Sequence, residues 1–139
     1  MATLSAAAAL QLPVRLHGIQ LGRPTDLLLD TADWHVLGFV VRCGDESTRF
    51  LPYAACQPGD DEIAVASALM LLEDVAFYEK RGVSFRALLD GDVVGGGVLR
   101  DVVLGVAGVI GELEIDQDGQ RVRVPSAGAV VVPTRASAA

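Results

Sequence analysis

A short pattern of residues occurs twice in this chain in the same order, and this repetition limits the folds that the chain can adopt. In each copy an aspartate precedes three aliphatic residues, a glycine follows within an aliphatic stretch, and a proline ends the next stretch. The offset is 75 residues for the aspartates and 73 for the glycines and prolines. The repeated positions are Asp26, Gly38 and Pro52 in the first copy and Asp101, Gly111 and Pro125 in the second. Their shared order predicts an internal duplication and therefore two related halves.

The periodicity within each copy is that of β-strands. From Leu113 to Val124, aliphatic and charged residues alternate on both sides of Asp118 and Gly119. Such alternation directs one face of a strand to a core, and Asp-Gly favours a tight turn in which both central residues have positive φ. This segment is therefore expected to form a hairpin. A second hairpin is predicted from Gly38–Arg42 and Thr48–Leu51, and short closing strands are expected at Ile63–Val65 and Val130–Val132.

A different pattern separates the two copies. The stretch Ala66–Arg81 contains no glycine or proline, its acids Glu73 and Asp74 precede Lys80, and Gly82 follows it. Acidic residues first, basic residues last and a glycine at the end are typical of a helix. We expect a short helix that ends near Gly82. Its start is open, because residues 66–72 could instead continue a strand.

With these elements in place, both copies resemble the PRC-barrel family, a small β-barrel of the photosynthetic reaction-centre H subunit and of the C-terminal domain of the ribosome maturation factor RimM. The second copy, Leu89–Pro133, carries the pattern best, with GGGVLRDVVLGVAGVIGELEI, then RVRVP, then AVVVP. The first copy, from about Val14 to Ala66, is looser, with LGRPTDLLLDTADWHVLGFVV, then RFLPYAA, then EIAV. It departs from the second where Asp30 stands in place of Gly105.

The resemblance implies a mainly β architecture of two small PRC-type β-barrels in tandem, joined by a short helix and packed about a pseudo-two-fold axis. The expected organisation is a flexible leader over 1–13, a first repeat over 14–66, a helical linker over 67–88, a second repeat over 89–133 and a disordered tail over 134–139. The family also implies a surface for assembly. We therefore expect a non-enzymatic adaptor that binds a protein partner or a second copy of the chain.

Charge restricts the class of partner. The net charge is −7, and Lys80 is the only lysine. Affinity for nucleic acid depends on Lys and Arg neutralising phosphates, so this balance argues against direct contact with DNA or RNA. It does not argue against a basic ribosomal protein, whose charge would be complementary. A factor associated with the ribosome or with RNA processing is therefore the alternative function.

The two cysteines, Cys43 and Cys56, form no disulfide framework and no metal-binding motif. They are interpreted as small buried hydrophobic residues in a reducing cytoplasm. No stretch reaches the ~18 uninterrupted apolar residues that a membrane helix needs. We expect a cytoplasmic protein with no membrane span.

The polar motifs do not predict a cofactor, metal or catalytic site. The acids around Asp118 resemble the start of a calcium loop, but Pro125 stands where a bidentate glutamate is required. His17 and His35 lack partners at zinc-binding spacing. The run Gly95–Gly97 lacks the Gly-Lys-Ser/Thr of a phosphate loop and is interpreted as a turn. Asp26 and Asp101 could be a general acid and base, but their repetition favours a shared role in turn structure.

Aromatic residues are the candidates for contacts with a partner. Trp34, Phe77, Tyr78 and Phe85 could each anchor an interface or pack within the fold. Phe77 and Tyr78 are adjacent on the predicted helix. Because neighbouring helical residues do not face the same side, one of the two is expected to project outward.

Overall fold

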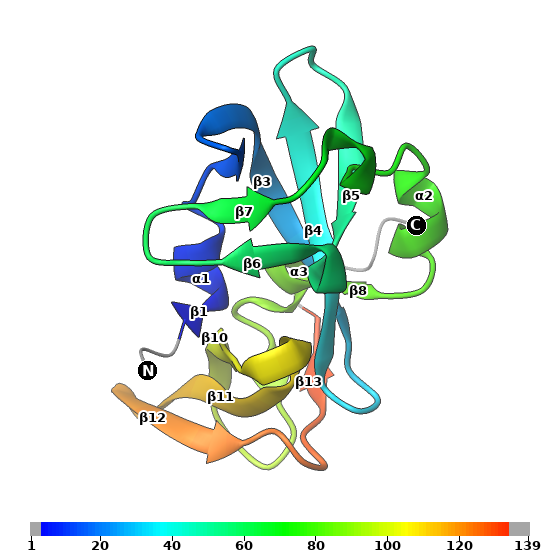
Figure 1. The fold of residues 1–139 in the computed structure, drawn as a ribbon. Coiled ribbons are helices and arrows are strands. Elements are labelled where there is room, and N and C mark those ends of the chain that lie inside the picture. Colours follow the sequence, from blue (N-terminus) through cyan, green and yellow to red (C-terminus); the bar gives the residue numbers. More distant parts are fainter. Residues whose placement is uncertain (1–3, 134–139) are drawn as a thin grey trace.

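The computed structural model describes residues 4–133 and shows a mainly β protein, as predicted (Figure 1). Within this range the strands form two sheets, one of which curls into a half-barrel. The first sheet has the order β5-β4-β3-β2-β7-β6, with β8 beside β3; the second has the order β12-β11-β10-β9-β13, with β1 beside β10. In Figure 1 the first sheet occupies the upper part of the molecule and the second the lower part.

The strands of the first sheet are β2 (Val14–Leu16), β3 (Ile19–Asp30), β4 (His35–Cys43), β5 (Thr48–Pro52), β6 (Cys56–Pro58), β7 (Ile63–Val65) and β8 (Val83–Ser84). Those of the second are β1 (Leu4–Ser5), β9 (Asp92–Val93), β10 (Val98–Leu104), β11 (Ile110–Gln117), β12 (Gln120–Pro125) and β13 (Val131–Val132). The helices are short: α1 (Ala6–Ala9), α2 (Val75–Glu79) and α3 (Phe85–Leu88), with 3₁₀ turns η1 (Tyr53–Ala55), η2 (Ala68–Met70) and η3 (Val106–Gly108).

Both predicted hairpins are confirmed. β11 pairs with β12 up to Gln117 and Gln120, and the two turn residues, Asp118 and Gly119, have φ values of 52° and 84°. The Asp116 carboxylate accepts a hydrogen bond from the Gly119 amide at 3.0 Å, so this acid stabilises the turn. β4 pairs with β5 through the longer predicted turn. The run Gly95–Gly97 is also a turn, in which all three φ values are positive.

The prediction of a flexible leader over residues 1–13 is wrong for residues 4–13, the part that the structure describes. Ser5 pairs with Val103 of β10, and its hydroxyl caps α1 by accepting a hydrogen bond from the Ala8 amide at 3.1 Å. Ala6 and Ala9 are completely buried in the main core. Small side chains allow this short helix to lie close to the sheet, which the composition of the segment did not reveal. Residues 1–3 and the predicted tail, 134–139, lie outside the described residues.

The predicted helical linker is only partly helical. The stretch 67–88 contains η2, α2, β8 and α3, so four short elements replace one helix. Asp74 caps α2 by accepting a hydrogen bond from the Phe77 amide at 3.2 Å, and the helix ends before Gly82, as predicted. The segment just before α2 lies beside β5, because the N–H and C=O of Phe50 both form hydrogen bonds with Leu72 at 2.8 Å. This isolated bridge fixes Leu72 beside β5, with a bend on each side of it, so the helix does not start before Asp74.

One hydrophobic core joins the two sheets. The main cluster of buried residues includes Val14, Phe39 and Ile63 from the first sheet and Leu99 and Ile115 from the second. Two short segments also connect the halves of the chain. The first, β1 with α1, packs on β10, and the second, β8 with α3, packs on β3; we call them the crossing segments. A smaller cluster, Leu28, Val40 and Phe50, lies under α2. The linker therefore covers the outer face of the first sheet.

The two repeated glycines offer a matched test of the packing. A Cβ added at Gly38 would overlap the Leu51 carbonyl oxygen and lie 2.6 Å from the Phe50 ring, whereas one added at Gly111 would meet nothing within 4 Å. We expect Gly38→Ala to lower the free energy of unfolding by about 1–3 kcal/mol or more. Gly111→Ala should change it by less than about 0.5 kcal/mol. Urea unfolding of both variants checks this, and equal effects would contradict the close approach of β5 to β4.

Candidate functional site

Two of the four aromatic candidates are buried inside the fold and are not surface contacts. Trp34 lies in the turn between β3 and β4, is 3% exposed, and donates its indole N–H to the Ala129 carbonyl oxygen at 3.1 Å. Its own carbonyl accepts a hydrogen bond from Ile110 at 2.9 Å, so this residue links the two sheets. Phe85 opens α3 and is fully buried in the main core. The sequence showed their size but not the sheets that enclose them.

The other two aromatic candidates lie together on α2 and face different directions. Tyr78 stacks on Phe50, with ring centroids 4.0 Å apart and planes 8° from parallel. Phe77 is 45% exposed and contacts Tyr78 edge-on, while the Arg81 guanidinium lies 4.2 Å from the Phe77 ring centroid. Thus Tyr78 holds the helix to the sheet, and Phe77 projects outward as the helical spacing predicts.

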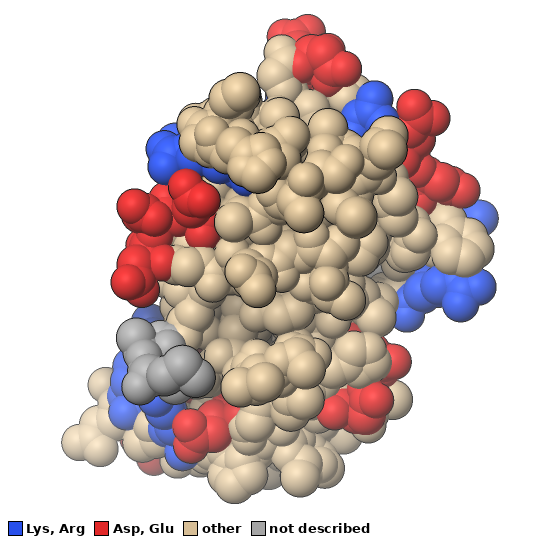
Figure 2. Space-filling model, in the orientation of Figure 1, with Lys and Arg blue, Asp and Glu red and all other residues tan. Residues whose placement is uncertain are grey.

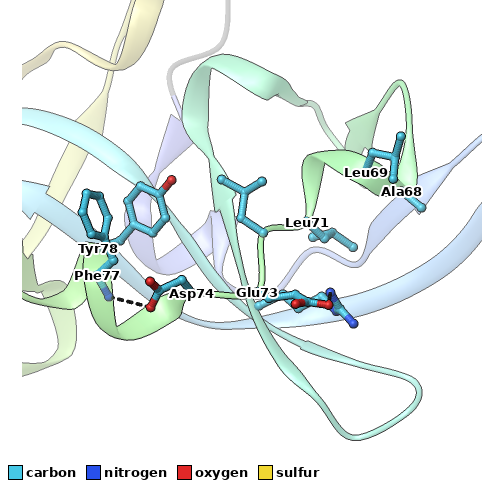
Figure 3. Close-up of a pocket in the computed structure, with 9 residues that line it drawn as sticks. Ala68, Leu69, Leu71, Glu73, Asp74, Phe77 and Tyr78 are labelled. Atoms are coloured by element: carbon cyan, nitrogen blue, oxygen red, sulfur yellow. Dashed lines mark hydrogen bonds and ion pairs between the residues drawn. The ribbon is translucent and has the colours of Figure 1, made fainter.

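Beside Phe77 lies a groove with a volume of 660 Å³, which we call the α2 groove (Figure 3). Leu69 is at one end and Phe77 and Tyr78 at the other, with acidic side chains between them. Leu69 is 85% exposed. The full lining is Arg49, Ala68, Leu69, Leu71, Leu72, Glu73, Asp74, Phe77 and Tyr78. Phe77 and Tyr78 were predicted from the sequence, but Leu69 was missed, because its only signal was an apolar residue in a linker.

Local hydrogen bonds set the shape of the α2 groove. The Ser67 hydroxyl caps η2 by accepting a hydrogen bond from the Leu69 amide at 3.1 Å. Next, Leu71 is buried in the main core, and Leu72 forms the backbone bridge to Phe50. Leu69 lies in the η2 turn just before these two anchors, and its side chain is exposed at the rim.

The charges around the α2 groove are mixed, with an excess of acids. Arg49 forms an ion pair with Glu73 at 3.4 Å, and Asp74 is the other acid of the lining. Arg49 also lies near Asp45, where hydrogen bonds from the Ser47 hydroxyl and amide, with a smaller effect of Arg49, lower the pKa of the carboxyl group. Figure 2 shows acidic side chains at the tip formed by the β4–β5 turn. A ligand with basic groups would fit this rim.

The repeated aspartates have the structural role that their repetition favoured. Asp101 accepts hydrogen bonds from the amides of Val102 at 2.8 Å and Ala7 at 3.1 Å. Asp26 accepts hydrogen bonds from the amides of Leu27 at 2.8 Å and Arg86 at 3.2 Å, and its other oxygen contacts the Ser84 hydroxyl. Each carboxylate therefore holds the start of a short helix that is distant in the sequence: α1 for Asp101 and α3 for Asp26.

One group of potential metal ligands was missed in the sequence. The ligand atoms of Asp30, Asp33 and His35 lie within 4.8 Å of one another in the β3–β4 turn. The His35 Nδ1 and the Asp33 carboxylate are 2.5 Å apart, and Asp30 accepts a hydrogen bond from the Ala32 amide. The spacing of two acids and a histidine over six residues was a readable signal. His17, Cys43 and Cys56 lie outside this group, and both cysteines are free thiols.

A search of family models gave no match for this chain, and a search of curated proteins gave none either. Among residues 4–133, no helix is long and apolar enough to cross a membrane.

The contacts of Asp101 predict a loss of stability when its side chain is removed. Asp101→Ala leaves the buried amide of Val102 and the partly buried amide of Ala7 without this acceptor. We expect the free energy of unfolding to fall by about 1–3 kcal/mol, measured by urea titration. The matched variant Asp60→Ala, at an exposed loop position, should change it by less than about 0.5 kcal/mol. An unchanged stability of Asp101→Ala would refute the docking of α1 by this carboxylate.

The thiol of Cys56 predicts a pH dependence. Burial raises its pKa from the ordinary 9.0 to about 12, and its Sγ donates to the Tyr53 carbonyl oxygen. Between these two values the folded state keeps a proton that the unfolded chain has lost, so stability falls as the pH rises above about 9. Urea unfolding across this range should show a shallower decline for Cys56→Ser than for the wild type.

A residual decline should remain in that variant, since burial also raises the pKa of Tyr53. The wild type, measured over the same pH range, gives the reference curve. If Cys56→Ser followed that curve, the thiol would not be the group that titrates.

Proposed function

We propose that this chain is a non-enzymatic adaptor of the PRC-barrel type, which binds a partner protein in the α2 groove. The observation that carries the proposal is the exposure of Leu69 and Phe77 at opposite ends of one groove, with Glu73 and Asp74 between them. Exposed apolar residues that frame a hollow and are flanked by charge mark sites of protein contact.

The fitting partner is a segment with an apolar side chain flanked by lysine or arginine. The apolar side chain would enter between Leu69 and Phe77, removing both from water. The basic residues would meet Glu73 and Asp74. The net charge of −7 favours the approach of such a basic partner over that of an acidic one.

The proposed duplication has support from the two crossing segments. Ser5 with α1 packs on the strand that carries Asp101, and Ser84 with α3 packs on the strand that carries Asp26. In each case the serine caps its own helix, and the aspartate accepts a hydrogen bond from the helix start. This reciprocity is what two PRC-type repeats related by a pseudo-two-fold axis would produce. It favours repeats that share one core over two independent barrels.

The second candidate function is association with the ribosome or with RNA processing through a basic ribosomal protein. The acidic rim of the α2 groove and the net charge favour it. Such an interaction would depend mainly on charge, so it would be lost when salt is raised, whereas contact through Leu69 and Phe77 would persist.

A pull-down from native lysate tests the groove with matched variants of exposed apolar residues. The wild type and Val94→Asp, whose valine is 66% exposed in the β9–β10 turn, should retain the same nuclease-resistant protein partner. Leu69→Asp should retain at least about tenfold less, because a charge at the anchor keeps the groove hydrated. Bound proteins are quantified by mass spectrometry at two salt concentrations.

Equal retention by Leu69→Asp and the wild type would refute the groove as the binding site. Enrichment of ribosomal proteins that disappears at the higher salt would favour the second function. Analytical ultracentrifugation of the purified protein identifies self-association, and a dimer disrupted by Leu69→Asp would make the partner a second copy.

A further inference from the structure

The end strands β5 and β12 differ in whether another segment pairs with their outer edges. β5 and β12 occupy matching places and end in the repeated prolines Pro52 and Pro125. The outer edge of β5 is closed by the linker, because Phe50 exchanges two backbone hydrogen bonds with Leu72. β12 ends the order of its sheet, and no strand among residues 4–133 pairs with its outer edge (Figure 1). One end strand is therefore protected and the other is open.

The register identifies the backbone groups on the open edge. Gln117 and Gln120 flank a two-residue turn, so they form a hydrogen-bonded pair, and such pairs recur at every second residue. Val122 and Val124 therefore bond inward to β11. The N–H and C=O groups of Arg121 and Arg123 point away from the sheet, where an added strand could bond to them.

The side chains of β12 define the chemistry of a strand that would fit. Arg121 and Arg123 are exposed and share one acid, Glu114 of β11. The other acids of that face lie on β11 or beyond, so a strand added outside β12 meets the two arginines first. On the opposite face Val122 and Val124 are partly buried against the main core. Alternate side chains of an added strand would therefore lie beside the arginines on one face and beside the valines on the other.

We infer that the outer edge of β12 is a second docking site, which takes an extended acidic segment of a partner protein by adding it as a strand. The segment alternates acidic residues, set beside Arg121 and Arg123, with aliphatic residues set beside Val122 and Val124. A second copy fits less well, since antiparallel pairing of β12 with itself places arginines opposite arginines. This goes beyond the proposed function, because it concerns another sheet and a partner of opposite charge.

The probe is a synthetic peptide with the sequence of residues 111–117, GELEIDQ, which already pairs with β12 inside the fold and has the required alternation. Added to the ¹⁵N-labelled full chain, it should shift the amide resonances of β12 and slow hydrogen exchange at Arg121 and Arg123. A peptide with lysine at each acidic position should produce neither effect. A peptide with proline at alternate positions should also fail, since it cannot supply the backbone donors.

Charge reversal at matched positions tests the edge within the protein. Arg123→Glu should weaken binding of GELEIDQ by about fivefold or more, because like charges would then face each other across the strands. Arg42→Glu, on β4 of the other sheet, changes the net charge equally and leaves an exposed side chain, so it should bind as the wild type does. Arg123→Pro should abolish the binding by removing an outward N–H without breaking a bond to β11.

Three results would overturn the inference: equal binding of the lysine peptide, resonance shifts outside β12 with none inside it, or no saturable binding of GELEIDQ. Protection of Arg121 and Arg123 in the protein alone, increasing with its concentration, would replace the acidic partner with a second copy. Leu69→Asp should bind the peptide normally, so failure of the α2 groove and failure of the β12 edge are distinguishable.

Discussion

The structure depends on two short segments that cross between the sheets. β1 with α1 comes from the start of the chain and packs on β10, and β8 with α3 comes from the middle and packs on β3. The hydrogen bonds to Asp101 and Asp26 fix where each helix begins, and a buried acceptor whose donors are removed is costly. Each sheet buries its apolar face partly against residues of the other half, so the two halves share one core and should unfold together.

Similar strands acquire different surfaces because one position differs. Phe50 of β5 has Arg123 of β12 as its counterpart, with Pro52 and Pro125 as the reference. The apolar Phe50 ring is stable only when it is removed from water, and Leu72 and Tyr78 pack over it. Arg123 is exposed and pairs with Glu114, so its side chain needs no apolar neighbour above it. The first half therefore presents the α2 groove, with apolar ends and acids between them, and the second half presents an open strand edge with charged side chains.

The sequence predicted the features that depend on neighbouring residues. The hairpin at Asp118 and Gly119 follows from turn chemistry, and the mainly β class follows from period-two alternation. It did not predict α1, because the partner of Ala7 is 94 residues away and small buried alanines look like a flexible segment. The burial of Trp34 and Phe85 likewise depends on sheets that meet only in the folded chain. Of the α2 groove, only Phe77 and Tyr78 could be anticipated.

The demands of folding explain the exposure of Phe77 but not that of Leu69. Tyr78 must face Phe50 to hold α2, and its neighbour must then project outward, whatever its function. Leu69 is under no such constraint, since Ser67 caps η2 and Leu71 supplies the buried anchor on either side of it. A polar residue at position 69 would serve this turn equally well and cost nothing in hydration. The proposed contact with a partner would give this apolar side chain, exposed at the rim of a groove without a packing role, a function.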